Sequence, residues 1–380
     1  MEYKRLGDIA TYINGYPFKP EDRGLTGLPI IRIQDLTGNS YDLGFYNGNY
    51  PERIEINDGD VLISWSASLG VYIWNKGKAL LNQHIFKVAF DKCEVNKQFF
   101  VYAVQYKLQE MGAKAHGATM KHIVKKDFDN TAIPFPALEE QEKIAQTMNR
   151  ISRIISDRQQ QLQKLDELVK ARFVEMFGDM LLNDMAWQES TLDTLADVVS
   201  GITKGRKMRE TELIEVPYMA VSNVKDGYID WTTVKTIEAT EQEINQYRLL
   251  PDDVLMTEGG DPDKLGRGAI IKAPLENCIH QNHIFRVRLD ESVILPIFFA
   301  EYLKHQKAKH YFLRCAKQTT GIASINMRQL KALPVLLPPL QLQRQFSVFV
   351  EQTDKSKVAV QKALDEAQLL FDSLMQKYFG

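Results

Sequence analysis

The sequence predicts an α+β fold with two similar domains, each a mixed β-sheet with helices, separated by two long antiparallel helices that form a coiled coil. Three observations predict this fold. Short strings of residues occur twice in the same order, each copy contains a strand-like alternation of apolar and polar residues, and each copy ends in a long heptad pattern. We expect the boundaries of the four parts at 1–137, 138–180, 181–338 and 339–380.

The duplication extends along the whole chain. Four pairs of strings, first copy then second, are LGDIATYING and LDTLADVVSG, VLIS and VLMT, HIFKV and HIFRV, and PALEEQEKI and PPLQLQRQF. The spacing between equivalent positions only grows, so each net insertion falls in the second copy. The largest insertion contains the glycine-rich stretch Gly259–Gly268 (GGDPDKLGRG), which is typical of a loop. Insertions confined to loops indicate that the two copies share one scaffold.

A period-two pattern occurs early in each domain. Isoleucine alternates with Arg32 and Gln34 in the segment 31–34, and apolar Met219 and Val221 recur at the equivalent positions of the second copy. This alternation is typical of a half-buried strand, so we expect a strand through each segment with its polar residues exposed. Because the apolar positions match while the polar ones differ, the two copies share a scaffold but not its exposed chemistry.

A heptad pattern follows each domain. Mostly apolar residues step by four and three positions from Ile144 to Met176, with Arg158 and Arg172 among them, and an equivalent series from Phe346 to Tyr378 includes Lys357. Such a seam, sustained over about five heptads, predicts a long coiled-coil helix. The alternative is that each helix lies separately on its own domain, but neither helix could bury its apolar stripe alone. The residues expected to form the helix pair and a surface for docking partners are Ile144, Met148, Ile151, Leu162, Leu165, Val169, Val350, Val360, Leu364, Phe371 and Leu374.

The composition is that of an ordinary globular chain, with 44% hydrophobic and 25% charged residues. The net charge of −2 does not exclude nucleic-acid binding, because the local distribution of charge decides it. Cys93, Cys278 and Cys315 are far apart and form no CxxC pair, which is typical of reduced thiols in a cytoplasmic protein. We expect no signal peptide and no contact with a membrane, because no apolar run is long enough.

The duplicated strings resemble the specificity subunit of type I restriction–modification systems over essentially the whole chain. They are DVLISWSASLG from Asp60, LNQHIFKV from Leu81, IPFPALEEQEKIA from Ile133, LQKLDELVKARFVEMFGD from Leu162, DVLMTEGGDPDKLGRGAI from Asp253 and LPPLQLQRQF from Leu337. Each string is weak alone, but their order and duplication are specific. The resemblance implies two target recognition domains that alternate with two long helices, each domain binding one part of a split, asymmetric DNA sequence.

The resemblance also implies the partners. It implies a non-catalytic subunit that binds double-stranded DNA and docks adenine methyltransferase (modification) subunits and ATP-dependent nuclease/translocase (restriction) subunits. We therefore expect no cofactor; the sequence has no NPPY- or DPPY-type methyltransferase signature and no GxxxxGK[ST] phosphate loop. Two alternatives stay open, namely a specificity subunit of a related two-chain restriction system and a coiled-coil scaffold that binds no DNA.

Candidate DNA-binding residues lie in basic stretches and at expected strand ends. The basic stretch TKGRKMR would neutralise phosphates, whereas polar residues at strand ends would hydrogen-bond to base edges in the major groove. The candidates are Arg32, Gln34, Ser64, Trp65, His84 and Lys121 in the first copy, and Lys204, Arg206, Lys207, Arg209, Ser222, Asn223, Thr257, Lys264, Arg267 and His283 in the second.

The glycine-rich loop replaces SWSASLG of the first copy at the same strand end. We expect Arg267 or Lys264 to contact DNA there, with Asp261 or Glu258 ordering the loop, since loops on a common scaffold usually hold recognition residues. Trp65, at the parallel position, is as compatible with a core position as with a base contact.

We expect His84 and His283, the histidines of the HIF strings, to have a structural role in or near strands. The alternative is that they contact DNA. A metal site at His280-x-x-His283 is not expected, because the residue equivalent to His280 in the first copy is Leu81.

We predict that the helix pair sets the distance between the two halves of the target. Inserting four residues near Asp157 adds about 5.4 Å of helix, comparable to one or two base-pair steps of roughly 3.4 Å. The tolerated gap should lengthen while both half-sites stay the same, as measured by mapping the modified sequence. An unchanged gap, with the helix intact by circular dichroism, would contradict this prediction.

Overall fold

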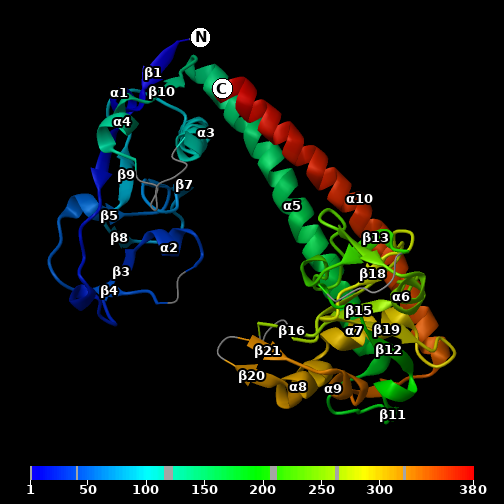
Figure 1. Ribbon diagram of the computed structural model, residues 1–380. Coiled ribbons are helices and arrows are strands. Elements are labelled where there is room, and N and C mark those ends of the chain that lie inside the picture. Colours follow the sequence, from blue (N-terminus) through cyan, green and yellow to red (C-terminus); the bar gives the residue numbers. More distant parts are fainter. Residues whose placement is uncertain (1, 40–41, 115–122, 206–211, 262–264, 320–321) are drawn as a thin grey trace. The chain divides into compact units, whose positions relative to one another are not determined.

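A computed structural model describes residues 2–39, 42–114, 123–205, 212–261, 265–319 and 322–380. The chain forms two compact units (Figure 1). The first unit comprises Met1–Gln159 with Gln361–Gly380, and the second comprises Gln160–Val360. Each unit therefore contains one of the two sequence copies together with part of both long helices.

The first unit contains two four-stranded sheets. One has the order β2 (Thr11–Asn14), β9 (Ile85–Ala89), β6 (Val61–Ser64) and β7 (Gly70–Ile73). The other has the order β4 (Phe45–Tyr46), β3 (Leu28–Ile31), β8 (Ala79–Leu81) and β5 (Glu55–Ile56), with β3 and β8 parallel. Strand β1 (Tyr3–Arg5) pairs with β10 (Ala132–Pro134). The helices are α1 (Leu6–Ile9), α2 (Ile33–Leu36), α3 (Lys97–Lys114), α4 (Lys125–Asn130) and the first part of α5 (Leu138–Phe177), with short 3-10 turns at Pro20–Asp22 and Glu52–Ile54.

The second unit repeats the main sheet. Its order is β12 (Ala196–Ser200), β19 (Ile284–Leu289), β15 (Val254–Thr257) and β17 (Gly268–Ile270). A second sheet consists of β14 (Lys235–Ala239), β13 (Ile214–Met219) and β18 (Ile279–His280), with β13 and β18 parallel. Strands β16 (Gly259–Gly260), β21 (Ile322–Ser324) and β20 (Lys317–Thr319) form a third sheet, and β11 (Gln188–Thr191) pairs with β22 (Pro334–Leu337). The helices are α6 (Glu241–Tyr247), α7 (Pro296–Lys304), α8 (Gln306–Cys315), α9 (Met327–Lys331), α10 (Leu340–Phe379) and the 3-10 turns Leu192–Thr194 and Val221–Asn223. The α+β fold with two similar units is thereby confirmed.

The strands expected across 31–34 and 219–222 are wrong beyond their first residues. The chain leaves the sheet at Ile31 and at Met219 and then forms one helical turn in each copy. The Asp35 carboxylate accepts a hydrogen bond from the Arg32 backbone N–H at 2.7 Å, and the side-chain oxygen of Asn223 accepts one from the Ala220 N–H at 2.9 Å. Such side-chain caps compete with strand pairing, and a four-residue alternation is too short to reveal them.

The two long helices pack on each other in both units. In the first unit Ile144 and Met148 of α5 share a core with Met375 and Phe379 of α10. In the second unit the end of α5 shares a core with the start of α10, so the helices run antiparallel. Lys357 and Asp166 form an ion pair between them at 2.8 Å. All residues expected to form the helix pair, from Ile144 to Leu374, are buried or half-buried.

Phenylalanines join the helix pair to the second unit. Phe346 of α10 lies with its ring centroid 5.4 Å from those of both Phe173 and Phe177 of α5. Phe177 in turn lies 4.9 Å from Phe298 of α7. Because Phe346 is fully buried, this cluster anchors both helices in the core of the unit.

Phe346→Ala should therefore destabilise the second unit by about 3–5 kcal/mol, since a buried aromatic side chain is lost and a cavity remains. The measurement is urea unfolding followed by circular dichroism. Val348→Ala is the matched control, because Val348 lies two residues further along the same helix and is 54% exposed. Equal losses for both variants would contradict the packing described.

Candidate nucleic-acid interface

In each unit, several strands end or begin along one edge of the sheets. In the first unit, the strand register brings together the ends of β2, β3, β6 and β8 and the starts of β7 and β9. In the second unit, it brings together the ends of β12, β13, β15 and β18 and the starts of β17 and β19. We call this feature the strand-end edge. It comprises Gly15–Tyr16, Arg32–Gln34, Trp65–Leu69 and Asn82–His84 in the first unit, and Gly201–Lys204, Ala220–Ser222, Glu258–Gly260 and Gln281–His283 in the second.

The same backbone hydrogen bonds hold this edge in both units. The Asn82 N–H donates to the Ile31 carbonyl at 3.1 Å, and the equivalent Gln281 N–H donates to the Met219 carbonyl at 3.0 Å. The next residue repeats the match. The Gln83 N–H donates to the Tyr16 carbonyl at 3.0 Å, and the equivalent Asn282 N–H donates to the Ile202 carbonyl at 3.0 Å. The frame of the edge is therefore duplicated, down to individual bonds.

A glycine in each copy permits this arrangement. A Cβ atom on Gly15 would lie 2.0 Å from the Asn82 carbonyl oxygen, and one on Gly201 would lie 1.9 Å from the His280 carbonyl oxygen. Any side chain there would push the following loop away from the sheet. This steric requirement explains why LGDIATYING and LDTLADVVSG both end in glycine.

Some predicted site residues are not exposed, and that part of the expectation is wrong. Ser64 and Thr257 are buried, because they end central strands that are covered on both faces. Asn223 is fully buried and caps the turn, and its amide also donates to the Asp230 carbonyl at 2.9 Å. Arg32 is held by Asp35 at 3.2 Å and by the carbonyl of residue 42. These side chains support the edge from beneath.

Other predicted residues do reach the surface of the edge. Gln34, Lys204, Ser222 and His283 are exposed. Trp65, His84 and Arg267 are half-buried, and the Nε atom of Arg267 has no partner within the described part of the chain. Lys121, Arg206, Lys207, Arg209 and Lys264 lie outside the described residues.

The structure adds one residue and one contact that sequence reasoning missed. Gln281 accepts a hydrogen bond from the Val221 N–H at 3.4 Å and ties two loops of the edge together. The Glu258 carboxylate contacts Nδ1 of His283 at 2.5 Å, a contact that the sequence did not predict. The sequence did contain a sign that Glu258 is a candidate site residue, because Glu258 stands at the position of Trp65 once the copies are aligned on their VLIS and VLMT strings.

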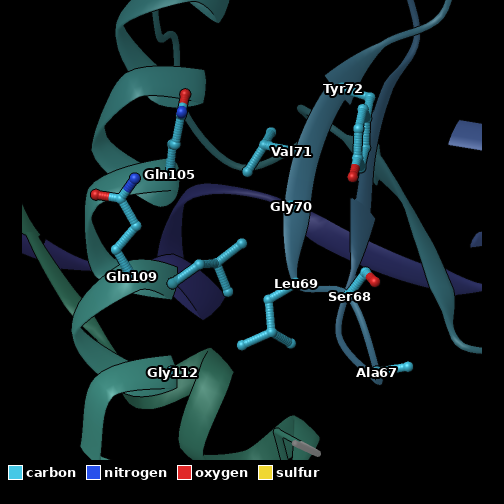
Figure 2. Close-up of a pocket in the computed structure, with 10 residues that line it drawn as sticks. Ala67, Ser68, Leu69, Gly70, Val71, Tyr72, Gln105, Gln109 and Gly112 are labelled. Atoms are coloured by element: carbon cyan, nitrogen blue, oxygen red, sulfur yellow. The ribbon is translucent and has the colours of Figure 1, made fainter. Parts of the chain in front are cut away.

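A cleft lies beside each edge. In the first unit it has a volume of about 650 Å³ and runs between α3 and the segment Ala67–Tyr72, with Gln105 and Gln109 reaching into it from α3 (Figure 2). The equivalent cleft of the second unit, about 270 Å³, is lined by Arg267, Lys304, Lys309 and Asp226 among others. The two copies therefore differ in the charge of this cleft.

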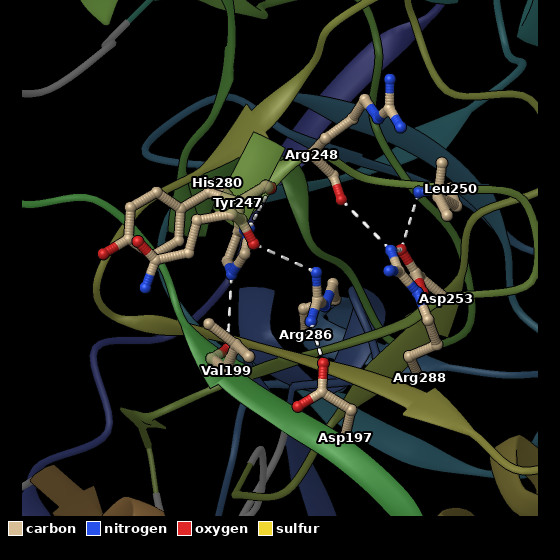
Figure 3. A network of polar contacts seen from close by, with 10 residues as sticks. Asp197, Val199, Tyr247, Arg248, Leu250, Asp253, His280, Arg286 and Arg288 are labelled. Carbon is tan, nitrogen blue, oxygen red and sulfur yellow. Dashed lines mark hydrogen bonds and ion pairs between the residues drawn. The ribbon is translucent and has the colours of Figure 1, made fainter. Parts of the chain in front are cut away.

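A polar network connects strands of the second unit in its interior (Figure 3). Arg288 binds Asp253 through two hydrogen bonds of 2.8 Å, and Asp253 also accepts from the Leu250 N–H at 2.7 Å. Arg286 pairs with Asp197 of the neighbouring strand. In the first unit Lys87 stands at the position of Arg286 and binds Asp60 at 2.9 Å.

His280 is fully buried in this network, directly before the loop of the edge. Its Nδ1 lies 3.0 Å from the Tyr247 carbonyl oxygen, and its Nε2 lies 3.4 Å from that of Val199. Burial lowers the pKa of His280 to about 4, and the nearby Arg286 cation acts in the same direction, while the two carbonyls oppose the shift. The imidazole is therefore neutral at pH 7, and one of its two ring nitrogens donates to the carbonyl that it faces.

Among the described residues, no group of three or more His, Cys, Asp or Glu side chains is placed to hold a metal ion. In the same part of the chain, no helix has the length and apolar character needed to cross a membrane.

Comparison with known proteins gives one consistent result. Residues 1–167 and 185–367 match the family described as type I restriction modification DNA specificity domain. The chain is 22% identical over 406 residues to the type I restriction enzyme EcoBI specificity subunit of Escherichia coli, covering 98% of this chain and 84% of the relative. It is 24% identical over 409 residues to the EcoKI specificity subunit of Escherichia coli (strain K12), covering 98% and 87%.

A solved structure has the same fold. The S subunit of a type I restriction–modification system from M. genitalium aligns with a TM-score of 0.58 and 18% identity, covering 100% of this chain and 96% of the other. A second structure, described as showing complex assembly and conformational transition of the type I R-M system, has the same TM-score at 16% identity, covering 99% and 97%.

The buried histidine predicts a pH dependence of stability. Its pKa is about 4 when folded and about 6.5 when unfolded, so the unfolded chain binds more protons between these values. The second unit should therefore lose about 2 kcal/mol of stability as the pH falls from 7 to 5. His280→Leu, which introduces the residue of the first copy, should remove this loss. Urea unfolding at both pH values measures it, and identical pH slopes for the two proteins would contradict the prediction.

Proposed function

The chain belongs to the type I restriction modification DNA specificity family, and we propose that it is the non-catalytic subunit that binds a two-part, asymmetric DNA sequence in the cytoplasm. Each unit binds one half of the target. Partner adenine methyltransferase and ATP-dependent nuclease subunits carry out modification and cleavage at the site that this chain selects.

The observation that carries the proposal is the duplicated strand-end edge. Both edges have the same backbone frame, so both units are suited to meeting DNA in the same way. Their exposed side chains differ, since Trp65 and Gln105 of the first unit are replaced by Glu258 and Lys304 in the second. Base pairs present distinct donor and acceptor patterns in the major groove. Because the two edges have the same backbone arrangement but different exposed side chains, we expect the two halves of the target to differ.

Phosphate contacts would position each unit on the duplex. Lys204 is exposed on the second edge, and the basic stretch that follows it contains Arg206, Lys207 and Arg209. Local positive charge of this kind supports binding to the phosphate backbone in a chain whose net charge is only −2.

The long helices offer surface for the partners. Several apolar residues on α5 and α10 are exposed although the seam itself is covered, so they are available for contact with a partner. They are Ile154, Leu168 and Val174 on α5, and Val348, Val358, Leu369 and Leu370 on α10. Leu168 and Leu370 occupy equivalent positions in the two helices, which supports docking on both copies.

Mapping methylated adenines in cells that hold this chain and its methyltransferase tests the proposal. We expect one split sequence with unlike halves. Replacing residues 181–337 with the second unit of another family member should then change one half only. A change in both halves would contradict the modular assignment, and a chain that binds no duplex DNA in a filter assay would be a scaffold instead.

Two basic sites of the second unit should differ in their effect on DNA binding. Neutralising Lys204 and Arg206 should weaken binding to target and random duplexes alike, and lower the salt slope by roughly two units, because phosphates are the same in every sequence.

Arg267→Ala should instead weaken target binding by about 1–3 kcal/mol through loss of a bidentate base contact. Binding to random duplexes should stay nearly unchanged, and only the second half-site should relax. Salt titrations of both variants on both duplexes make the comparison. Equal losses on the two duplexes for Arg267→Ala would identify Arg267 as another phosphate contact.

A further inference from the structure

The two units place different side chains at one structurally equivalent position. The N–H of Trp65 donates to the His84 carbonyl at 3.3 Å, and the N–H of Glu258 donates to the His283 carbonyl at 3.0 Å. On the other side, the carbonyls of Trp65 and Glu258 accept from residues 123 and 325 at 3.0 and 2.8 Å. Because the backbone is held alike, the difference between the units lies in the side chain.

In the first unit the position is aromatic and half-buried. The Trp65 ring stacks on Phe86 with centroids 5.5 Å apart and meets His84 edge-on at 5.0 Å. In the second unit the position is polar and also half-buried. The Glu258 side chain is 34% exposed, and its Oε2 contacts Nδ1 of His283, whose side chain is 56% exposed.

A carboxylate on a DNA-binding edge needs a hydrogen-bond donor, since phosphates repel it. His283 supplies one donor to Oε2, and the Glu258 carboxylate has further acceptor sites that can bind a ligand. In the major groove, cytosine presents the N4 amino group as a donor. Adenine presents its N6 amino group beside the N7 acceptor, which a carboxylate avoids. Cytosine is therefore the base whose edge suits Glu258.

We infer that Glu258 is a specificity-determining residue that accepts a hydrogen bond from the N4 amino group of a cytosine in the second half of the target, with His283 as its positioning residue. This inference rests on the proposed function, because it requires the strand-end edge to meet the major groove.

The test is a binding selection on a library of randomised duplexes, using the full chain with its methyltransferase subunits. The wild-type complex should prefer cytosine at one position of the second half-site. Glu258→Gln should lower that preference by about five- to 150-fold. It should also turn the preference at this position toward adenine, because an amide pairs with both N6 and N7. Preferences at all other positions should stay as they are.

Affinity for random duplex DNA gives an independent readout. Glu258→Gln should bind it more tightly than the wild type, because a repelling charge is removed, although binding to the target weakens. A purely structural role for Glu258 would not move the two affinities in opposite directions. His283→Gln should weaken the cytosine preference at the same position without tightening random binding, since the carboxylate is retained.

Glu291→Gln is the matched control. Glu291 is an exposed carboxylate that follows β19, whereas His283 precedes it, so the same charge is removed away from the edge. It should leave every base preference unchanged. If Glu258→Gln leaves the preferences of a sequence-specific complex unchanged, or lowers all of them equally, the inference is overturned. If the wild-type complex shows no base preference at all, the proposed function fails instead.

Discussion

The structure depends on one constraint, namely that neither long helix can bury its apolar stripe by itself. Each unit therefore contains a segment of both helices. The ring centroid of Phe379, at the end of α10, lies 5.3 Å from that of Phe99 in the core of the first unit. Phe346, near the start of the same helix, packs against α5 in the core of the second unit. Because the helices are antiparallel, the last residues of the chain complete the domain that the first residues begin.

On this support, the fold separates the backbone of the recognition surface from its chemistry. The loops at Asn82–His84 and Gln281–His283 are held by the same hydrogen bonds to their neighbours, and Gly15 and Gly201 permit the same close approach. These backbone hydrogen bonds do not depend on side-chain identity, except at the two glycines. Positions on this frame can therefore change without moving the edge, as the exchange of Trp65 for Glu258 illustrates.

The cores beneath the two edges have diverged as well. The first unit uses the ion pair of Lys87 and Asp60, with Leu81 at the end of β8. The second unit places His280 at the equivalent position, close to the charged groups of Arg286 and Asp253. Burial of this ionisable imidazole makes the stability of the second unit depend on pH.

The sequence by itself determined the duplication, the buried central strands, the two long helices and the seam between them, because these features repeat with a fixed period along the chain. It did not determine which polar residues at strand ends are exposed. Thr257 is buried and Ser222 is exposed, although both directly follow an apolar residue in a segment expected to be a strand. Nor did it reveal the contact between Glu258 and His283, which are 25 residues apart. Only the tertiary structure decided these points, because strand register and turn geometry bring distant residues together, and local periodicity contains no information about either.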